Sequence, residues 1–166
     1  MSIDSIIRFW GRAALVRWPR EVVAGTSLPN EAKAFLTEVG LPTGVDWTMR
    51  FGPVANDVPR LDRHPAYRVI GYDCEAPICL DEEHEGRVVS DPDGYERFAN
   101  ASVGLFAEYL VLYQQYRLAA RNLDEEAIQD VIAETERQMA TLDPSALAGP
   151  ECFWAVVIEQ MRAGLL

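Results

Sequence analysis

Residues 98–116 read FANASVGLFAEYLVLYQQY, and this stretch decides the fold of the chain. It contains no Lys or Arg, and its large side chains recur at the i, i+3, i+4, i+7 spacing that is typical of one helix face. The recurring positions are Phe106, Tyr109, Leu110, Tyr113 and Tyr116. Asn100 or Ser102 can cap the first turn of this helix. A stripe of this kind lines either a ligand groove or the core. Because each large aromatic side chain contributes about 2–3 kcal/mol when buried, we predict that the stripe covers a sheet as core.

The residues directly before this helix, from Trp47 to Phe98, have the texture of strands. Short β-rich runs lie between turn residues: WTMRF (47–51), YRVIGYD (67–73), PICLD (77–81) and RVVSD (87–91). Their close spacing favours antiparallel hairpins over βαβ crossovers. Residues 53–67, which contain three prolines, are predicted to form a loop.

Helical patterns lie on both sides of the predicted strands. We expect one helix over residues 2–18, stopped by Pro19, and a short one within residues 26–42 that ends at Gly40. Asp124 can cap a helix after the aromatic stripe, and residues 151–166 form the last helical pattern. The predicted fold class is therefore α+β, with a mostly antiparallel sheet flanked by N-terminal and C-terminal helices.

Composition narrows the class of protein. The 166 residues are expected to form one domain over residues 1–166. A net charge of −11 argues against direct binding of nucleic acid, which requires a basic surface. Arg8, Arg12 and Arg17 interrupt the N-terminal apolar residues, so we expect no signal peptide, no membrane association and a cytoplasmic protein. Three cysteines do not suggest a disulfide framework.

The sequence offers little that could carry catalysis. It contains no nucleophile elbow, P-loop, dinucleotide fingerprint or zinc-protease motif. The best metal candidate is the C-x4-C-x4-H spacing of Cys74, Cys79 and His84, but a structural zinc site needs a fourth ligand. We expect Cys79 to be a small buried hydrophobic residue, and we expect no metal, no cofactor and no enzyme activity. An enzyme or metal site at these three residues stays open as the least favoured alternative.

The ordered blocks resemble a known group of proteins. The segments AKAFLTEVGLP, VIGYDCEAPICLDEEHEGRVVS, FANASVGLFAEYLVLYQQYR and DPSALAGPECFWAVVIEQMRAGLL follow one another within residues 28–166. Together they resemble the fourth family of the SUKH (Smi/Knr-like) superfamily of immunity proteins from bacterial polymorphic toxin systems. One departure is Phe153 beside Trp154, where paired tryptophans are expected. The resemblance implies an α+β fold and a non-enzymatic protein that neutralises one cognate toxin, often a nuclease or a nucleic-acid deaminase.

The acidic residues provide a candidate contact surface. Between Asp73 and Glu96 there are nine acidic residues and a single Arg. This stretch is either a solvated hairpin or an electrostatic landing surface for a basic toxin. Under the second interpretation we predict six contact residues: Asp73, Glu75, Asp81, Glu82, Glu83 and Glu85. The alternative function is a regulatory or scaffold module of the same fold with a non-toxin partner.

Overall fold

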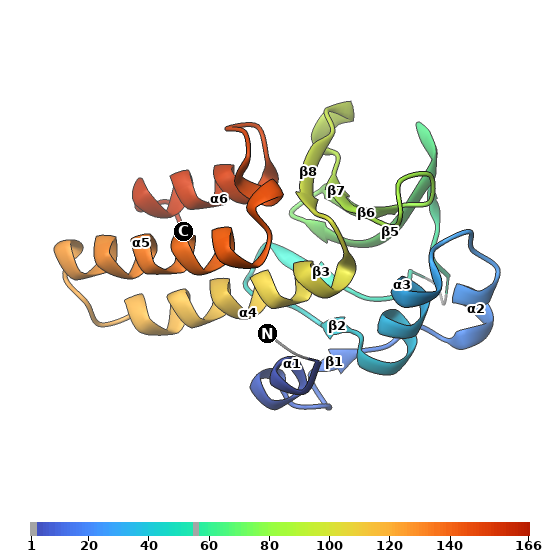
Figure 1. The fold of residues 1–166 in the computed structure, drawn as a ribbon, viewed down its shortest axis with the longest axis horizontal. Coiled ribbons are helices and arrows are strands. Elements are labelled where there is room, and N and C mark those ends of the chain that lie inside the picture. Colours follow the sequence, from blue (N-terminus) through green and yellow to red (C-terminus); the bar gives the residue numbers. More distant parts are fainter. Residues whose placement is uncertain (1–2, 55–56) are drawn as a thin grey trace.

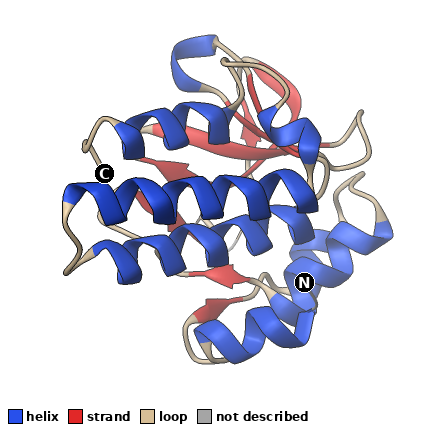
Figure 2. Cartoon of the chain, turned by 60° about the vertical axis from the view of Figure 1, so that its left-hand side comes forward, coloured by secondary structure: helices blue, strands red, loops and turns tan. Residues whose placement is uncertain are grey.

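The computed structural model describes residues 3–54 and 57–166, and it has the predicted α+β architecture. A curled antiparallel sheet lies beside a layer of long helices, and the N-terminal part of the chain forms shorter helices (Figure 1). Figure 2 shows the long helices in front of the strands.

The larger sheet is a meander of hairpins, as predicted. Its hydrogen-bonded order is β3-β5-β6-β7-β8, and β4 pairs with the other part of β5. All of these pairs are antiparallel. The strands are β3 (Met49–Phe51), β4 (Arg60–Leu61), β5 (His64–Asp73), β6 (Ala76–Asp81), β7 (Val88–Ser90) and β8 (Arg97–Asn100). The register of β5 against β6 shifts between Val69 and Gly71, and such a bulge strengthens the local bend of a sheet.

The prediction of a loop over residues 53–67 was wrong in part. Residues 60–61 form β4, and residues 64–67 begin β5, while Ala55 and Asn56 lie outside the described residues. Pro65 is tolerated because pairing of β5 with β6 begins only at Tyr67. Proline content alone therefore overestimated the loop.

The long helices start where the sequence predicted. They are α4 (Val103–Ala120), α5 (Glu125–Leu142) and α6 (Phe153–Arg162). Ser102 is the cap of α4, because its Oγ accepts from Leu105 N at 3.3 Å. Asp124 caps α5, with its Oδ1 3.0 Å from Ala127 N. The two candidate caps of α4 are thereby resolved in favour of Ser102.

The N-terminal region departs from the prediction of one helix over residues 2–18. Helix α1 (Ile3–Trp10) ends before Gly11, whose φ of +76° is left-handed, and Ser2 lies outside the described residues. The chain then forms β1 (Leu15–Val16), which pairs with β2 (Leu41–Pro42). Between these strands lie α2 (Arg20–Ala24), α3 (Asn30–Ala34) and the π-helical turn η1 (Phe35–Val39). That turn ends at Gly40, as predicted, and Gly40 has a positive φ of +83° with an extended ψ of −173°.

The aromatic stripe of α4 is core, which confirms the first prediction. Phe106 and Tyr109 are completely buried. Trp154 of α6 packs on this face, with its ring centroid 5.8 Å from that of Phe106 and 5.3 Å from that of Tyr109. The stripe is therefore not a ligand groove.

A buried polar network joins the last strand to the C-terminal helices. Trp154 Nε1 donates to Asn100 Oδ1 at 2.8 Å, and Asn100 Nδ2 donates to Asp143 Oδ2 at 3.0 Å. Tyr109 Oη donates to Met139 O at 2.6 Å. Each of these buried groups thus has a partner, which fixes how α5 and α6 sit on β8.

Candidate partner-binding surface

The six predicted contact residues lie in two separate turns. Asp73 is the last residue of β5 and Glu75 lies in the turn that follows it, whereas residues 81–85 lie at and after the other end of β6. Strand β6 has six residues, so the two turns are roughly 17 Å apart at 3.3 Å per residue. The acids form two clusters, one at each end of β6, rather than one.

Asp81 is a structural residue in this fold. Its side chain is 1% exposed, and its Oδ2 lies 3.0 Å from Arg87 Nε and 2.7 Å from His84 Nδ1. Burial on its own would raise the pKa of Asp81, but hydrogen bonds from Glu83 N, Arg87 and His84 outweigh burial, and the pKa is lowered. Asp81 therefore holds the β6–β7 turn and has no surface to offer a partner.

Glu82 is also turned inward. Its side chain is 6% exposed, with Oε1 2.9 Å from Arg68 Nε. The same oxygen accepts from Ser27 N at 2.6 Å, which ties the loop between α2 and α3 to the sheet. Asp81 and Glu82, two of the predicted contact residues, therefore have side chains that are only 1% and 6% exposed.

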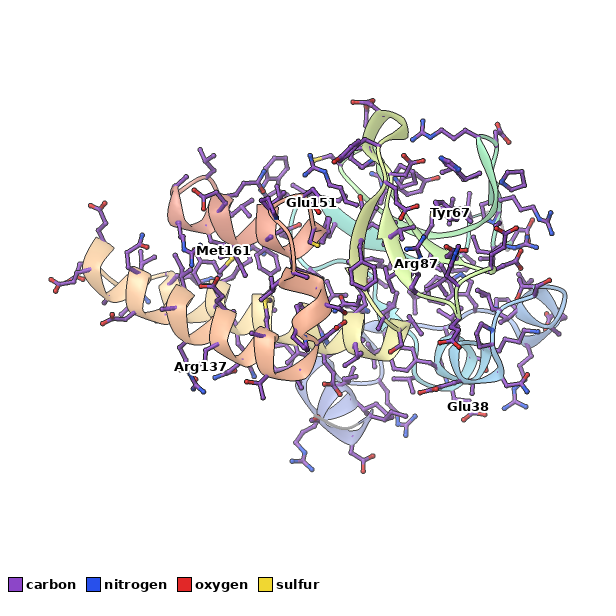
Figure 3. All side chains as sticks on the ribbon, turned by 45° about the horizontal axis from the view of Figure 1, so that its top comes forward. Glu38, Tyr67, Arg87, Arg137, Glu151 and Met161 are labelled. Carbon is purple, nitrogen blue, oxygen red and sulfur yellow. The ribbon has the colours of Figure 1, made fainter. Side chains whose placement is uncertain are left out.

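Two side chains of the sheet region bind another acid of this stretch, Glu96. Tyr67 Oη donates to Glu96, and Arg87 Nη2 lies 3.1 Å from Glu96 Oε1. Figure 3 shows Tyr67 and Arg87 on the same part of the molecule. Much of the negative charge of residues 73–96 is thus paired with arginine side chains of the same chain.

The remaining predicted acids are available to a partner. Glu75, Glu83 and Glu85 are exposed, and their carboxylates have no hydrogen bond or ion pair among the described residues. Asp73 is partly buried; burial raises its pKa, the Thr48 hydroxyl opposes this, and the charge of Asp46 raises it further. A positively charged neighbour would therefore stabilise the ionised carboxylate of Asp73.

A groove collects acids at the β5–β6 turn. It has a volume of about 480 Å³ and is lined by Asp73, Glu75 and Asp93, with Tyr72 and Pro92 among its apolar residues. This volume is in the range of sites that hold a small ligand or a few side chains.

Arg63 is the basic residue in this groove, but its charge is already engaged. Arg63 Nε lies 2.6 Å from Oδ2 of Asp91, whose side chain is completely buried. The groove therefore keeps an excess of negative charge. Asp93, in the DPDG turn of the acidic stretch, is not among the six predicted contact residues, but it lines the same groove as Glu75.

The cysteine and histidine candidates are not brought together. Cys74 is exposed in the β5–β6 turn, whereas Cys79 is buried beside Tyr67 and Val89. Burial raises the pKa of Cys79 to about 12, so its thiol stays neutral. In residues 3–54 and 57–166, no group of three or more His, Cys, Asp or Glu side chains is placed to hold a metal ion.

A comparison with protein-family models identifies the family of this chain. The model of a family described as SUKH-4 immunity protein matches residues 4–160, from α1 to α6. The chain belongs to the SUKH-4 immunity protein family. The match includes the N-terminal helices, which the resemblance over residues 28–166 had left out. Membership in the SUKH-4 family indicates an immunity function through binding of a cognate toxin.

Other comparisons add no relatives. No curated protein and no solved structure matches this SUKH-4 chain. Within the described ranges, none of its helices combines the length and the apolar character needed to cross a bilayer.

Proposed function

We propose that this SUKH-4 protein, acting as one domain in the cytoplasm, binds and neutralises a basic cognate toxin without catalysis. The toxin class that fits best is a nuclease or a nucleic-acid deaminase, because such enzymes need a basic surface for phosphates. The observation that carries the proposal is the groove with Asp73, Glu75 and Asp93, whose acids outnumber its single, already paired arginine. The family match supports the toxin as partner.

The two acidic clusters have different expected roles. A net charge of −11 attracts a basic partner over long distances and can raise association rates toward about 10⁸–10⁹ M⁻¹s⁻¹ at low salt. Glu83 and Glu85 contribute to this long-range attraction from the β6–β7 turn. The groove, in contrast, can desolvate a basic side chain, and a close charge pair acts mainly on the dissociation rate.

Two double variants test this division with matched charge. Glu75→Gln/Asp93→Asn and Glu83→Gln/Glu85→Gln each remove two negative charges from exposed positions. Asn is suitable at Asp93 because it tolerates the φ of +53° found there. The partner to be tested is the toxin domain of any toxin gene found next to the gene for this chain, purified as a catalytically inactive variant. Stopped-flow kinetics are recorded at several salt concentrations.

We expect the groove variant to lose about tenfold in affinity, mostly through faster dissociation. The matched variant should show slower, less salt-dependent association and nearly unchanged dissociation. Wild-type kinetics in both variants would show that the acidic clusters contribute to solubility and not to toxin binding. Failure of the wild-type protein to bind that toxin, with binding of a different cellular protein, would favour the regulatory or scaffold module.

A further inference from the structure

Trp47 is unusual among the four tryptophans of the chain. Its side chain is 83% exposed, whereas Trp18 and Trp154 are 2% and 0% exposed. Tryptophan combines a large apolar area with a polar N–H group, and exposed apolar clusters often mark interaction sites. The exposure of Trp47 therefore indicates a candidate interaction site.

The turn that carries Trp47 is rigidly supported. Oδ1 of Asp46 accepts from Thr48 N and from Met49 N, both at 2.8 Å. Oδ2 of the same carboxylate accepts from Tyr113 Oη at 2.9 Å, which links the turn to the core helix α4. Trp47 is thus held in place by its neighbours while its indole faces solvent.

Further apolar side chains lie next to Trp47. A hollow of about 230 Å³ is lined by Trp47, Val157 and the leucines that follow α6. Leu165 is 72% exposed and Leu166 is 38% exposed. Gly164, with φ +67°, turns the chain back so that Leu165 N donates to Gln160 O at 3.0 Å. The leucines therefore lie beside the indole.

The hollow lies next to the acidic groove. Asp73 and Cys74 line both, so the β5–β6 turn forms their common border. One side of this border offers apolar surface, and the other offers unpaired carboxylates. A partner that fits both sides must present an apolar side chain next to a basic one.

We infer that Trp47, Leu165 and Leu166 form the apolar anchor of the toxin interface, and that the occupant is a toxin segment with adjacent apolar and basic side chains. This inference rests on the proposed function. The basic side chain lies over Asp73 and Glu75, and the apolar side chain packs on the indole. Interfaces concentrate their affinity in a few such anchors, among which Trp is enriched, while surrounding residues exclude water.

Trp47→Ala tests the anchor, with the same inactive toxin domain as the partner. Since the side chain is exposed, the variant should keep the wild-type circular dichroism and melting temperature. We expect its affinity for the toxin to fall at least about 30-fold, and Trp47→Phe to recover part of the loss. Ile3→Ala, which truncates a 51% exposed side chain on α1, is the matched control and should bind normally.

Fluorescence gives a second measurement that does not depend on affinity. Toxin binding should shift the emission of Trp47 to shorter wavelength and protect it from acrylamide. Both changes should be absent with Trp47→Phe, which assigns them to this residue rather than to tryptophans of the toxin.

The outcomes separate this inference from the function on which it rests. If the wild-type protein does not bind the toxin, both fall together. If it binds and Trp47→Ala binds equally tightly, only the anchor is overturned. Light scattering that shows a dimer for the free wild-type chain and a monomer for Trp47→Ala would assign the patch to self-association and would also overturn the anchor.

Discussion

Phe106 shows how strongly one residue of the aromatic stripe is held. It is completely buried, and its ring centroid lies 5.7 Å from that of Phe51 and 5.8 Å from that of Trp154. Phe106→Ala leaves a cavity between strand and helix, and we expect it to lower the free energy of unfolding by about 3–5 kcal/mol. Urea denaturation measures the change. Leu118→Ala, at a 46% exposed position of the same helix, should change it by less than about 1 kcal/mol. Equal midpoints for the two variants would contradict the burial of Phe106.

The role of Asn100 depends on residues that are distant in the sequence. Asn100 and Ser102 are both good helix caps, so the sequence alone left the choice open. Ser102 takes that role, whereas the partners of Asn100 are Asp143 and Trp154, 43 and 54 residues farther along the chain. Contacts at such separation have no local signature.

At the scale of elements, Gly40 allows the η1 turn to enter the small β1–β2 sheet. Its φ is +83°, and a Cβ at this position would lie 2.1 Å from Val16 O. Gly11 also has a positive φ, of +76°, but a Cβ there would meet nothing within 4 Å. Gly40 is therefore required both by its backbone conformation and by the close approach of Val16, whereas Gly11 is favoured by its backbone conformation alone.

We expect Gly40→Ala to destabilise the protein by more than about 3 kcal/mol, because it adds a backbone clash to the strained conformation. Gly11→Ala should cost only about 1–2 kcal/mol, the cost of the left-handed conformation. Thermal and urea unfolding of both variants measure the difference. Similar losses would show that strand β1 can move away from Gly40.

The elements differ in how visible they are in the sequence. The long helices and the hairpins were predictable, because periodicity and turn residues repeat within each of them. The two-residue strands β1 and β2 were not, since they are too short for a pattern. Apolar spacing continues past Gly11 through Leu15 to Trp18, which made one helix seem natural although Gly11 was the available stop signal.

The candidate site was visible only in part for a related reason. Charge density drew attention to residues 73–96, but it cannot distinguish Glu75, which is free, from Asp81, which is buried against Arg87. Trp47 gave no signal at all, because a tryptophan in a strand-like run is normally expected inside. Exposure is a property of the assembled fold.

For the whole molecule, paired carboxylates set the response to acid. The folded pKa of Asp81 lies below its unfolded value of about 4, so its contribution to stability is full above that pH. It is lost as the pH falls through the folded pKa. We expect Asp81→Asn to lower the free energy of unfolding at pH 7 by about 1.5–3 kcal/mol, and this difference to close below about pH 4. Urea denaturation across the pH range measures it.

Asp73 supplies the opposite control. Its folded pKa is raised, so its ionised form costs stability as the pH rises. Asp73→Asn should therefore be more stable than wild type at pH 7, by about 0.5–1 kcal/mol, and should lose this advantage in acid. Parallel pH curves for the two variants would contradict these assignments. A gain at Asp73 with weaker toxin binding would identify a residue kept for binding at the expense of stability.

The bond between Trp154 and Asn100 also has a consequence in time. The ribosome makes Trp154 54 residues after Asn100, a delay on the order of 3–10 s at 5–20 residues per second. During that interval the aromatic face of the nascent chain lacks the cover that Trp154 provides. The acidic turns are synthesised early, but the body that holds them is complete only when α6 has emerged. The core of each molecule therefore stays incomplete until α6 has been synthesised, and the order of the residues sets the length of this interval.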